Sequence, residues 1–101
     1  MTYKQLIHME PEEISEDARL LYVCAFILDQ WRRMGFHEGP RALDTEENVW
    51  VKTKLLRHPD GLWQFSDASI EAGIQWLVAT WIQQGITVNL DVSSRLMELK
   101  G

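Results

Sequence analysis

The sequence predicts an α+β fold in which two long helices pack together with a β-hairpin. Three observations carry this prediction. Apolar residues recur at helical spacing in residues 15–34 and 67–84, β-branched and alternating residues fill 49–57, and a Pro-Asp-Gly turn follows them. The chain has 101 residues, 46% of them hydrophobic and 25% charged, which is the composition of one globular domain spanning 1–101. Within it, only residues 1–10 are expected to form a loose arm.

The first helix is expected over residues 15–34. Ser15 is a good N-cap, and Gly35 supplies the residue that commonly follows the last helical turn. The apolar residues of this segment cover an arc of about 200° around the helix, which is wider than one neighbouring element usually covers. Two explanations follow. Either the helix is central in the fold, or another copy of the chain buries part of it in a homodimer.

The segment 49–65 is predicted to be a β-hairpin. Its first strand places Val49, Val51, Thr53 and Leu55 on one face, and the turn His58-Pro59-Asp60-Gly61 leads into a return strand at 62–65. The alternative is a helix over residues 45–57. Asp44 and Glu47 have the spacing of a capping box for such a helix, and the whole fold would then be an all-α bundle.

The last part of the chain is predicted to form a helix, a short strand and a final helix. The helix over 67–84 ends at Gly85, and its core stripe consists of Ile70, Ile74, Leu77, Val78 and Trp81. Residues 86–90 have the composition of a strand, and residues 92–99 form the C-terminal helix.

The sequence offers no recognisable set of catalytic or metal-binding residues, so we predict neither an enzyme nor a cofactor. The single cysteine, Cys24, falls within an apolar run, which is typical of a core residue. His8, His37 and His58 are not spaced as paired metal ligands. A lone cysteine and the lack of a signal peptide or a long apolar run favour a soluble, cytoplasmic protein.

The negative charge of the chain is concentrated in its first half. The net charge is −5, and residues 1–48 carry ten acidic side chains against five basic ones, whereas residues 49–101 carry five of each. The acidic residues cluster at 10–17 and 44–47. Such a field repels nucleic acids and anionic membranes, so neither is an expected partner, but it attracts a basic protein surface.

Five tryptophans in a chain of this length are unusual. Four of them divide into two groups, and the face of the fifth, Trp63, depends on the register of the predicted hairpin. Trp31 and Trp81 lie on apolar helix faces and are expected in the core. Trp50 shares its predicted strand face with two lysines, and Trp76 lies off the main apolar stripe beside alanines, Thr80 and Gln83. Aromatic side chains in such positions are typical anchors of protein contacts. The expected contact residues are Trp50, Trp76, Tyr22, Phe26, Glu12, Glu13, Glu16 and Asp17.

The leading hypothesis for function is therefore a non-enzymatic, acidic protein-binding module. It would occlude a basic surface on its target, as an inhibitor, an immunity protein or a phage accessory protein does. The alternatives are a small-ligand-binding domain with a tryptophan-lined pocket and a structural homodimer formed through the helix at 15–34.

Overall fold

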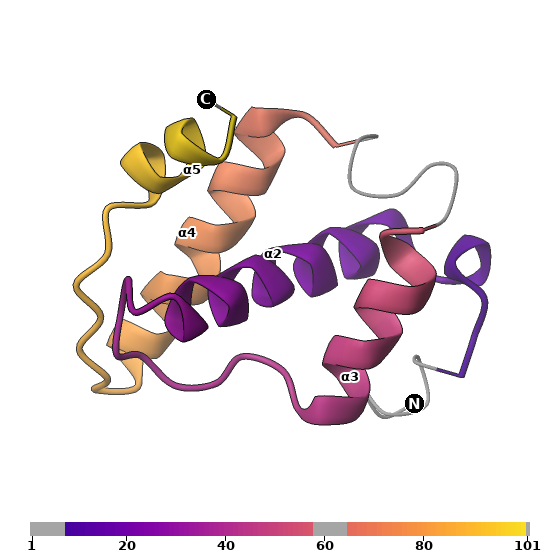
Figure 1. Ribbon diagram of the computed structural model, residues 1–101, viewed down its shortest axis with the longest axis horizontal. Coiled ribbons are helices and arrows are strands. Elements are labelled where there is room, and N and C mark those ends of the chain that lie inside the picture. Colours follow the sequence, from indigo (N-terminus) through magenta and orange to yellow (C-terminus); the bar gives the residue numbers. More distant parts are fainter. Residues whose placement is uncertain (1–7, 58–64, 101) are drawn as a thin grey trace.

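The fold is built from helices arranged around one central helix, α2. The computed structural model describes residues 8–57 and 65–100. The chain forms η1 (Pro11–Glu13), α2 (Glu16–Arg33), α3 (Thr45–Trp50), η2 (Val51–Leu55), α4 (Asp67–Gln83) and α5 (Val92–Lys100) (Figure 1). None of the described residues forms a strand. The predicted α+β fold is therefore wrong, and the all-α alternative describes the molecule.

Helix α2 begins and ends where the sequence predicts. The Ser15 hydroxyl accepts a hydrogen bond from the Ala18 amide, which satisfies one of the free donors of the first turn. At the other end Gly35 adopts a left-handed conformation with φ of 84°. This turn allows the Phe36 amide to donate to the Trp31 carbonyl at 3.0 Å.

Two hydrophobic clusters share α2, which explains its wide apolar arc. On one side Tyr22 and Val23 pack with residues of α3 and η2. On the other side α2 packs against α4, with Val92 of α5 in the same cluster; its buried members are Cys24, Leu28, Trp31, Ile70, Ile74, Val78 and Val92. The helix is central within its own chain. The observation that suggested a homodimer through residues 15–34 is thus accounted for without a second copy.

The predicted first strand at 49–57 is a helix instead. The capping box that defined the helical alternative is formed, because the Glu47 amide donates to Asp44 and the Asp44 amide donates to Glu47. Helix α3 then widens into one π-helical turn, η2, closed by a hydrogen bond of 2.9 Å from the Leu56 amide to the Val51 carbonyl. The predicted turn and most of the return strand fall at 58–64, outside the described residues.

Helix α4 matches its predicted range closely, but the segment after it is not a strand. Ser66 caps α4 by accepting from the Ser69 amide, and Gly85 ends it in a left-handed conformation. Residues 86–91 then run extended across the molecule to α5 without pairing to any strand of the described chain. The predicted strand at 86–90 is therefore wrong, whereas the predicted C-terminal helix is confirmed.

Buried polar side chains fix the loop between α2 and α3. Asp29 accepts hydrogen bonds from the amides of Ala42 and Leu43 and from the Asn48 side chain. His37 is also buried, and its two ring nitrogens contact the Leu28 carbonyl and the Gly39 amide. A loop without regular structure is held in this way against the end of α2.

The first described residues pack against the core, and no described helix could cross a membrane. Met9 is half-buried against the cluster that contains Tyr22, and Glu10 caps η1. Most of the predicted loose arm at 1–10, residues 1–7, lies outside the described residues. Among the described residues, no helix combines the length and apolarity that a bilayer span requires.

Candidate functional site

The outer face of α4 carries large apolar side chains in solvent. Ile70, Ile74 and Val78 turn towards α2 and are buried, as their helical spacing predicts. The opposite side of the same helix is what we call the outer face of α4. It consists of Ala72, Gln75, Trp76, Ala79, Ile82 and Gln83, all of them exposed. Trp76 has 58% of its surface exposed and Ile82 has 56%.

The outer face of α4 is also free of charge. No Asp, Glu, Lys, Arg or His occurs anywhere in residues 72–90, although the chain as a whole is one-quarter charged. A helix on the surface of a globular protein usually turns charged and polar residues outwards. A solvent-facing helix face with a tryptophan and no charge is therefore typical of a surface that another molecule covers.

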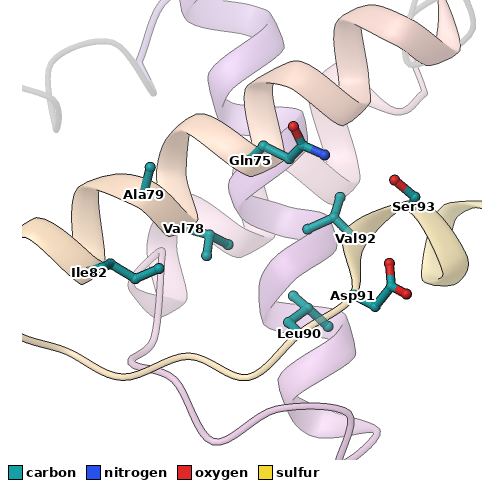
Figure 2. Close-up of a pocket in the computed structure, with 8 residues that line it drawn as sticks. All are labelled: Gln75, Val78, Ala79, Ile82, Leu90, Asp91, Val92 and Ser93. Carbon is teal, nitrogen blue, oxygen red and sulfur yellow. The ribbon is translucent and has the colours of Figure 1, made fainter.

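A shallow groove runs between α4 and the segment that leads into α5 (Figure 2). Its volume is about 300 Å³, and its lining residues are Gln75, Val78, Ala79, Ile82, Leu90, Asp91, Val92 and Ser93. Ile82 and Ala79 belong both to this groove and to the outer face of α4. The apolar surface around Trp76 is thus continuous with a hollow that could receive a side chain.

The end of the groove near α5 is acidic. Hydrogen bonds from the side chain and the amide of Ser94 hold the pKa of Asp91 below its ordinary value, so this carboxylate is charged at neutral pH. A second carboxylate, Glu71 of α4, accepts hydrogen bonds from Ser93 and Gln75, which both line the groove. A ligand in the groove would therefore meet apolar side chains along α4 and negative charge at this end.

Two of the predicted aromatic contact residues are buried. Trp50 is 6% exposed and Tyr22 is 3% exposed, and their rings meet edge-on with centroids 5.1 Å apart. The strand prediction placed Trp50 beside Lys52 and Lys54 on an outer face, but the helix turns it inwards onto α2. Phe26 is half-buried against the same cluster. Trp50 and Tyr22 are therefore corrected to core residues, and Trp76 is the predicted aromatic with most of its surface in solvent.

The predicted acidic contact residues are exposed but lie away from Trp76. Glu12 and Glu13 belong to η1, and Glu16 and Asp17 form the first turn of α2. In Figure 1 this region lies at the far end of α2 from the segment that borders the groove. The structure thus does not join Trp76 and the acidic cluster at 10–17 into one patch.

The other tryptophans add no second aromatic patch to the described surface. Trp31 is fully buried, as predicted. Trp81 is half-buried and packs on the cluster shared by α2 and α4, with its ring centroid 6.2 Å from that of His37. Trp63 lies outside the described residues. No tryptophan of the described residues lines the groove, so among these residues the groove is not the tryptophan-lined pocket of the ligand-binding alternative.

The potentially reactive side chains of the described chain are held in structural roles. Burial raises the pKa of the Cys24 thiol to about 12, and its sulfur donates to the Ile70 carbonyl at 3.5 Å. A thiol in this state is a poor nucleophile at neutral pH. In residues 8–57 and 65–100, no three of the His, Cys, Asp and Glu side chains are grouped as metal ligands.

Sequence reasoning missed Ile82 and the groove beside it. Ile82 is neither in the predicted core stripe nor next to Trp76 in sequence, but on a helical wheel it falls beside Gln75 and Ala79. The helical wheel could therefore have identified Ile82 as an outer-face residue. The groove could not be predicted in this way, because it depends on how residues 90–93 cross α4.

Comparison with known proteins gives no relative for this chain. The sequence matches no family of proteins, and neither a curated protein nor a solved structure is significantly similar to it. The functional argument therefore depends on the surface itself.

Proposed function

We propose that this chain is a non-enzymatic protein-binding module whose contact surface is the outer face of α4. The observation that carries the proposal is the exposure of Trp76 and Ile82 on a helix face without charge. Tryptophan is enriched among the residues that dominate binding energy, and leaving one in water has a cost in free energy that a partner would remove.

The groove and its acidic end define the chemistry of the partner. An apolar side chain would fill the hollow between Ile82 and Leu90, and a basic group would face Asp91 and Glu71. The separate acidic cluster at 10–17 would not touch this contact. It would act at a distance, by raising the rate at which a basic protein approaches.

The proposal is tested with Trp76→Ala and a matched control, Met34→Ala. Met34 is also a large exposed apolar residue, but it follows α2 and lies outside the outer face of α4. A protein captured from an extract of the source organism by the unmodified chain is identified, purified and titrated against each variant. We expect Trp76→Ala to weaken binding about 30-fold, the loss typical of an interface hot spot, and Met34→Ala to leave it unchanged.

Two results would contradict this proposal. If the partner binds Trp76→Ala and the unmodified chain with equal affinity, the outer face of α4 is not the contact surface. Sedimentation that shows a dimer of the unmodified chain and a monomer of Trp76→Ala would make the surface a homodimer interface instead.

The charge of the partner is tested separately, with a variant that carries lysine in place of Glu12, Glu13 and Glu16. Steering by charge predicts that this variant associates more slowly with a basic partner and that added salt removes the difference. An association rate that responds to neither change would exclude a basic partner while leaving the role of Trp76 intact.

A further inference from the structure

Three of the six arginines of the chain surround one hollow at the C-terminal end of α2. The hollow has a volume of about 150 Å³, and its lining residues are Asp29, Arg32, Arg33 and Arg41. We propose that this hollow, which we call the arginine pocket, binds a small oxyanion of the phosphate class, either free or as the terminal group of a phosphate monoester.

Hydrogen bonds to the surrounding chain hold two of the guanidinium groups in place. The Arg32 Nε donates to the Gly39 carbonyl at 3.0 Å, and an Arg41 Nη donates to the Thr45 hydroxyl at 2.9 Å. A guanidinium has five N–H donors, so each of these groups keeps donors for a ligand. Arginines oriented before binding lose less side-chain entropy when a ligand arrives.

The positive charge of the arginine pocket is not neutralised by ion pairs. Within residues 8–57 and 65–100, ion pairs join Glu10 to Lys54 and Arg95 to Glu98, and none involves a lining arginine. Asp29 is the only carboxylate of the lining. Its oxygens already accept from the amides of Ala42 and Leu43 and from Asn48. The lining therefore has three positive charges and one negative charge in a chain whose net charge is −5.

Stabilisation of the helix end explains only part of this arrangement. Arg32 and Arg33 occupy the last turn of α2, where positive charge favours the helix dipole. Arg41 does not belong to that helix. It comes from the loop that Asp29 fixes, eight residues beyond Arg33, and the Thr45 hydroxyl holds it beside the other two.

A single phosphate group suits both the size and the charge of the arginine pocket. A cavity of about 150 Å³ is large enough for benzene, so a single phosphate group also has room. Arginine forks match the geometry of phosphate oxygens and donate charge-assisted hydrogen bonds to them. A long polyanion such as nucleic acid would be repelled by the acidic residues elsewhere on the chain.

The test follows the arginine Nε resonances of the intact chain by NMR during titration with inorganic phosphate and, separately, with glycerol phosphate, at constant ionic strength. We expect saturable shifts at Arg32, Arg33 and Arg41. Saturation by both compounds identifies the phosphate group itself as the ligand, and saturation by glycerol phosphate alone identifies a monoester. Arg33→Gln and Arg41→Gln are each expected to weaken binding about tenfold, because each removes a charged donor.

The matched control is Arg57→Gln, which removes an exposed arginine that does not line the pocket and should bind as the unmodified chain does. Shifts that do not saturate, that chloride reproduces, or that persist in both Arg33→Gln and Arg41→Gln would overturn the proposal. The Arg33 side chain makes no hydrogen bond to a described residue, so the Arg33→Gln variant is informative even if Arg41→Gln loosens the loop. Phosphate binding that persists in Trp76→Ala separates this site from the outer face of α4.

Discussion

At the scale of single residues, Asp29 has the largest structural role among the polar side chains. It is 3% exposed, and its two oxygens accept three hydrogen bonds, at 2.6 Å from the Ala42 amide, 2.9 Å from the Leu43 amide and 3.1 Å from Asn48. All three donors are neutral, so the carboxylate is stabilised by dipoles instead of by a buried ion pair. This one group ties the loop and Asn48 of α3 to α2.

Replacement of Asp29 by alanine is expected to lower the free energy of unfolding by about 3–5 kcal/mol, because it leaves several buried donors without an acceptor. Urea denaturation followed by circular dichroism measures the loss. Asp17→Ala is the control, since Asp17 is exposed in the first turn of α2 and should cost less than about 1 kcal/mol. Similar losses in the two variants would show that the hydrogen bonds of Asp29 contribute little.

The thiol of Cys24 gives the chain a dependence on alkaline pH. Burial raises the pKa of this thiol from its ordinary 9.0 to about 12, so the folded chain holds the proton more tightly than the unfolded chain. The resulting stability is complete below pH 9 and is lost as the pH rises towards 12. We expect the free energy of unfolding to fall by up to about 1.4 kcal/mol per pH unit in this range.

The same denaturation series on Cys24→Ala isolates the contribution of the thiol, because lysines and tyrosines titrate in both proteins. The difference in stability between the two chains should narrow steadily above pH 9. A constant difference up to pH 11 would exclude this role of Cys24.

The tryptophans show what a sequence can predict about a site at this scale. The position of Trp76 off the core stripe followed from helical periodicity, since the segment 67–84 was correctly predicted to be a helix. The position of Trp50 was predicted wrongly, because the same residue lies on a different side of the chain in a strand than in a helix. An error in secondary structure thus became an error in the predicted contact surface.

At the scale of elements, α3 and η2 show why the hairpin prediction failed. The alternation from Val49 to Leu55 resembles a strand, and β-branched residues strengthen that impression. Burial instead follows helical spacing, with Val51 and Leu55 inside and Val49 in solvent. The capping box at Asp44 and Glu47 pointed to the helix, and here the packing onto α2 outweighed β propensity.

Helices α2 and α4 approach each other closely at Gly73. A Cβ atom added there would lie 2.6 Å from the Cys24 sulfur, so the two helices meet where a side chain is absent. We expect Gly73→Ala to lower the free energy of unfolding by about 1–3 kcal/mol through overpacking, despite the better helix propensity of alanine.

A double-mutant cycle with Cys24→Ala tests whether this contact is the cause. Removal of the sulfur makes room for the new methyl group, so the double variant should be more stable than the sum of the two single changes predicts. If the two changes in the free energy of unfolding simply add, the contact with Cys24 is not the cause of the destabilisation by Gly73→Ala.

At the scale of the whole molecule, both hydrophobic clusters depend on α2. Val23 belongs to the cluster with η2, and Cys24 and Leu28 belong to the cluster with α4. Neighbouring residues of one helix thus face two different halves of the core. Neither half keeps its buried surface if α2 unfolds.

The molecule is therefore expected to unfold in a single cooperative step. Val51→Ala and Ile74→Ala each remove buried methyl groups from a different cluster and should each lower the free energy of unfolding by about 2–4 kcal/mol. Thermal curves from circular dichroism and from tryptophan fluorescence should coincide for both variants. Separate transitions, or a variant that loosens one cluster alone, would show that the two halves fold independently.

Part of the fold and of the contact surface could be predicted from the sequence. Both long helices and their glycine ends followed from periodicity and capping, which are local properties. The sequence left two explanations for the wide apolar arc of α2, a central helix or a homodimer, and did not decide between them. The groove and the arginine pocket could not be predicted, because Leu90 and Arg41 reach them through loops whose path depends on the whole fold.

The two ends of α2 bear opposite charge, and this charge separation forms an electric dipole along the helix. Glu16 and Asp17 stand in its first turn and Arg32 and Arg33 in its last, about 24 Å apart at the rise of an α-helix. These full charges exceed and oppose the half charges of the peptide dipole. In the field of a charged neighbour the molecule therefore feels a torque as well as a pull. This torque would turn the acidic end of α2 towards a basic protein and the basic end towards a phosphate ion before contact.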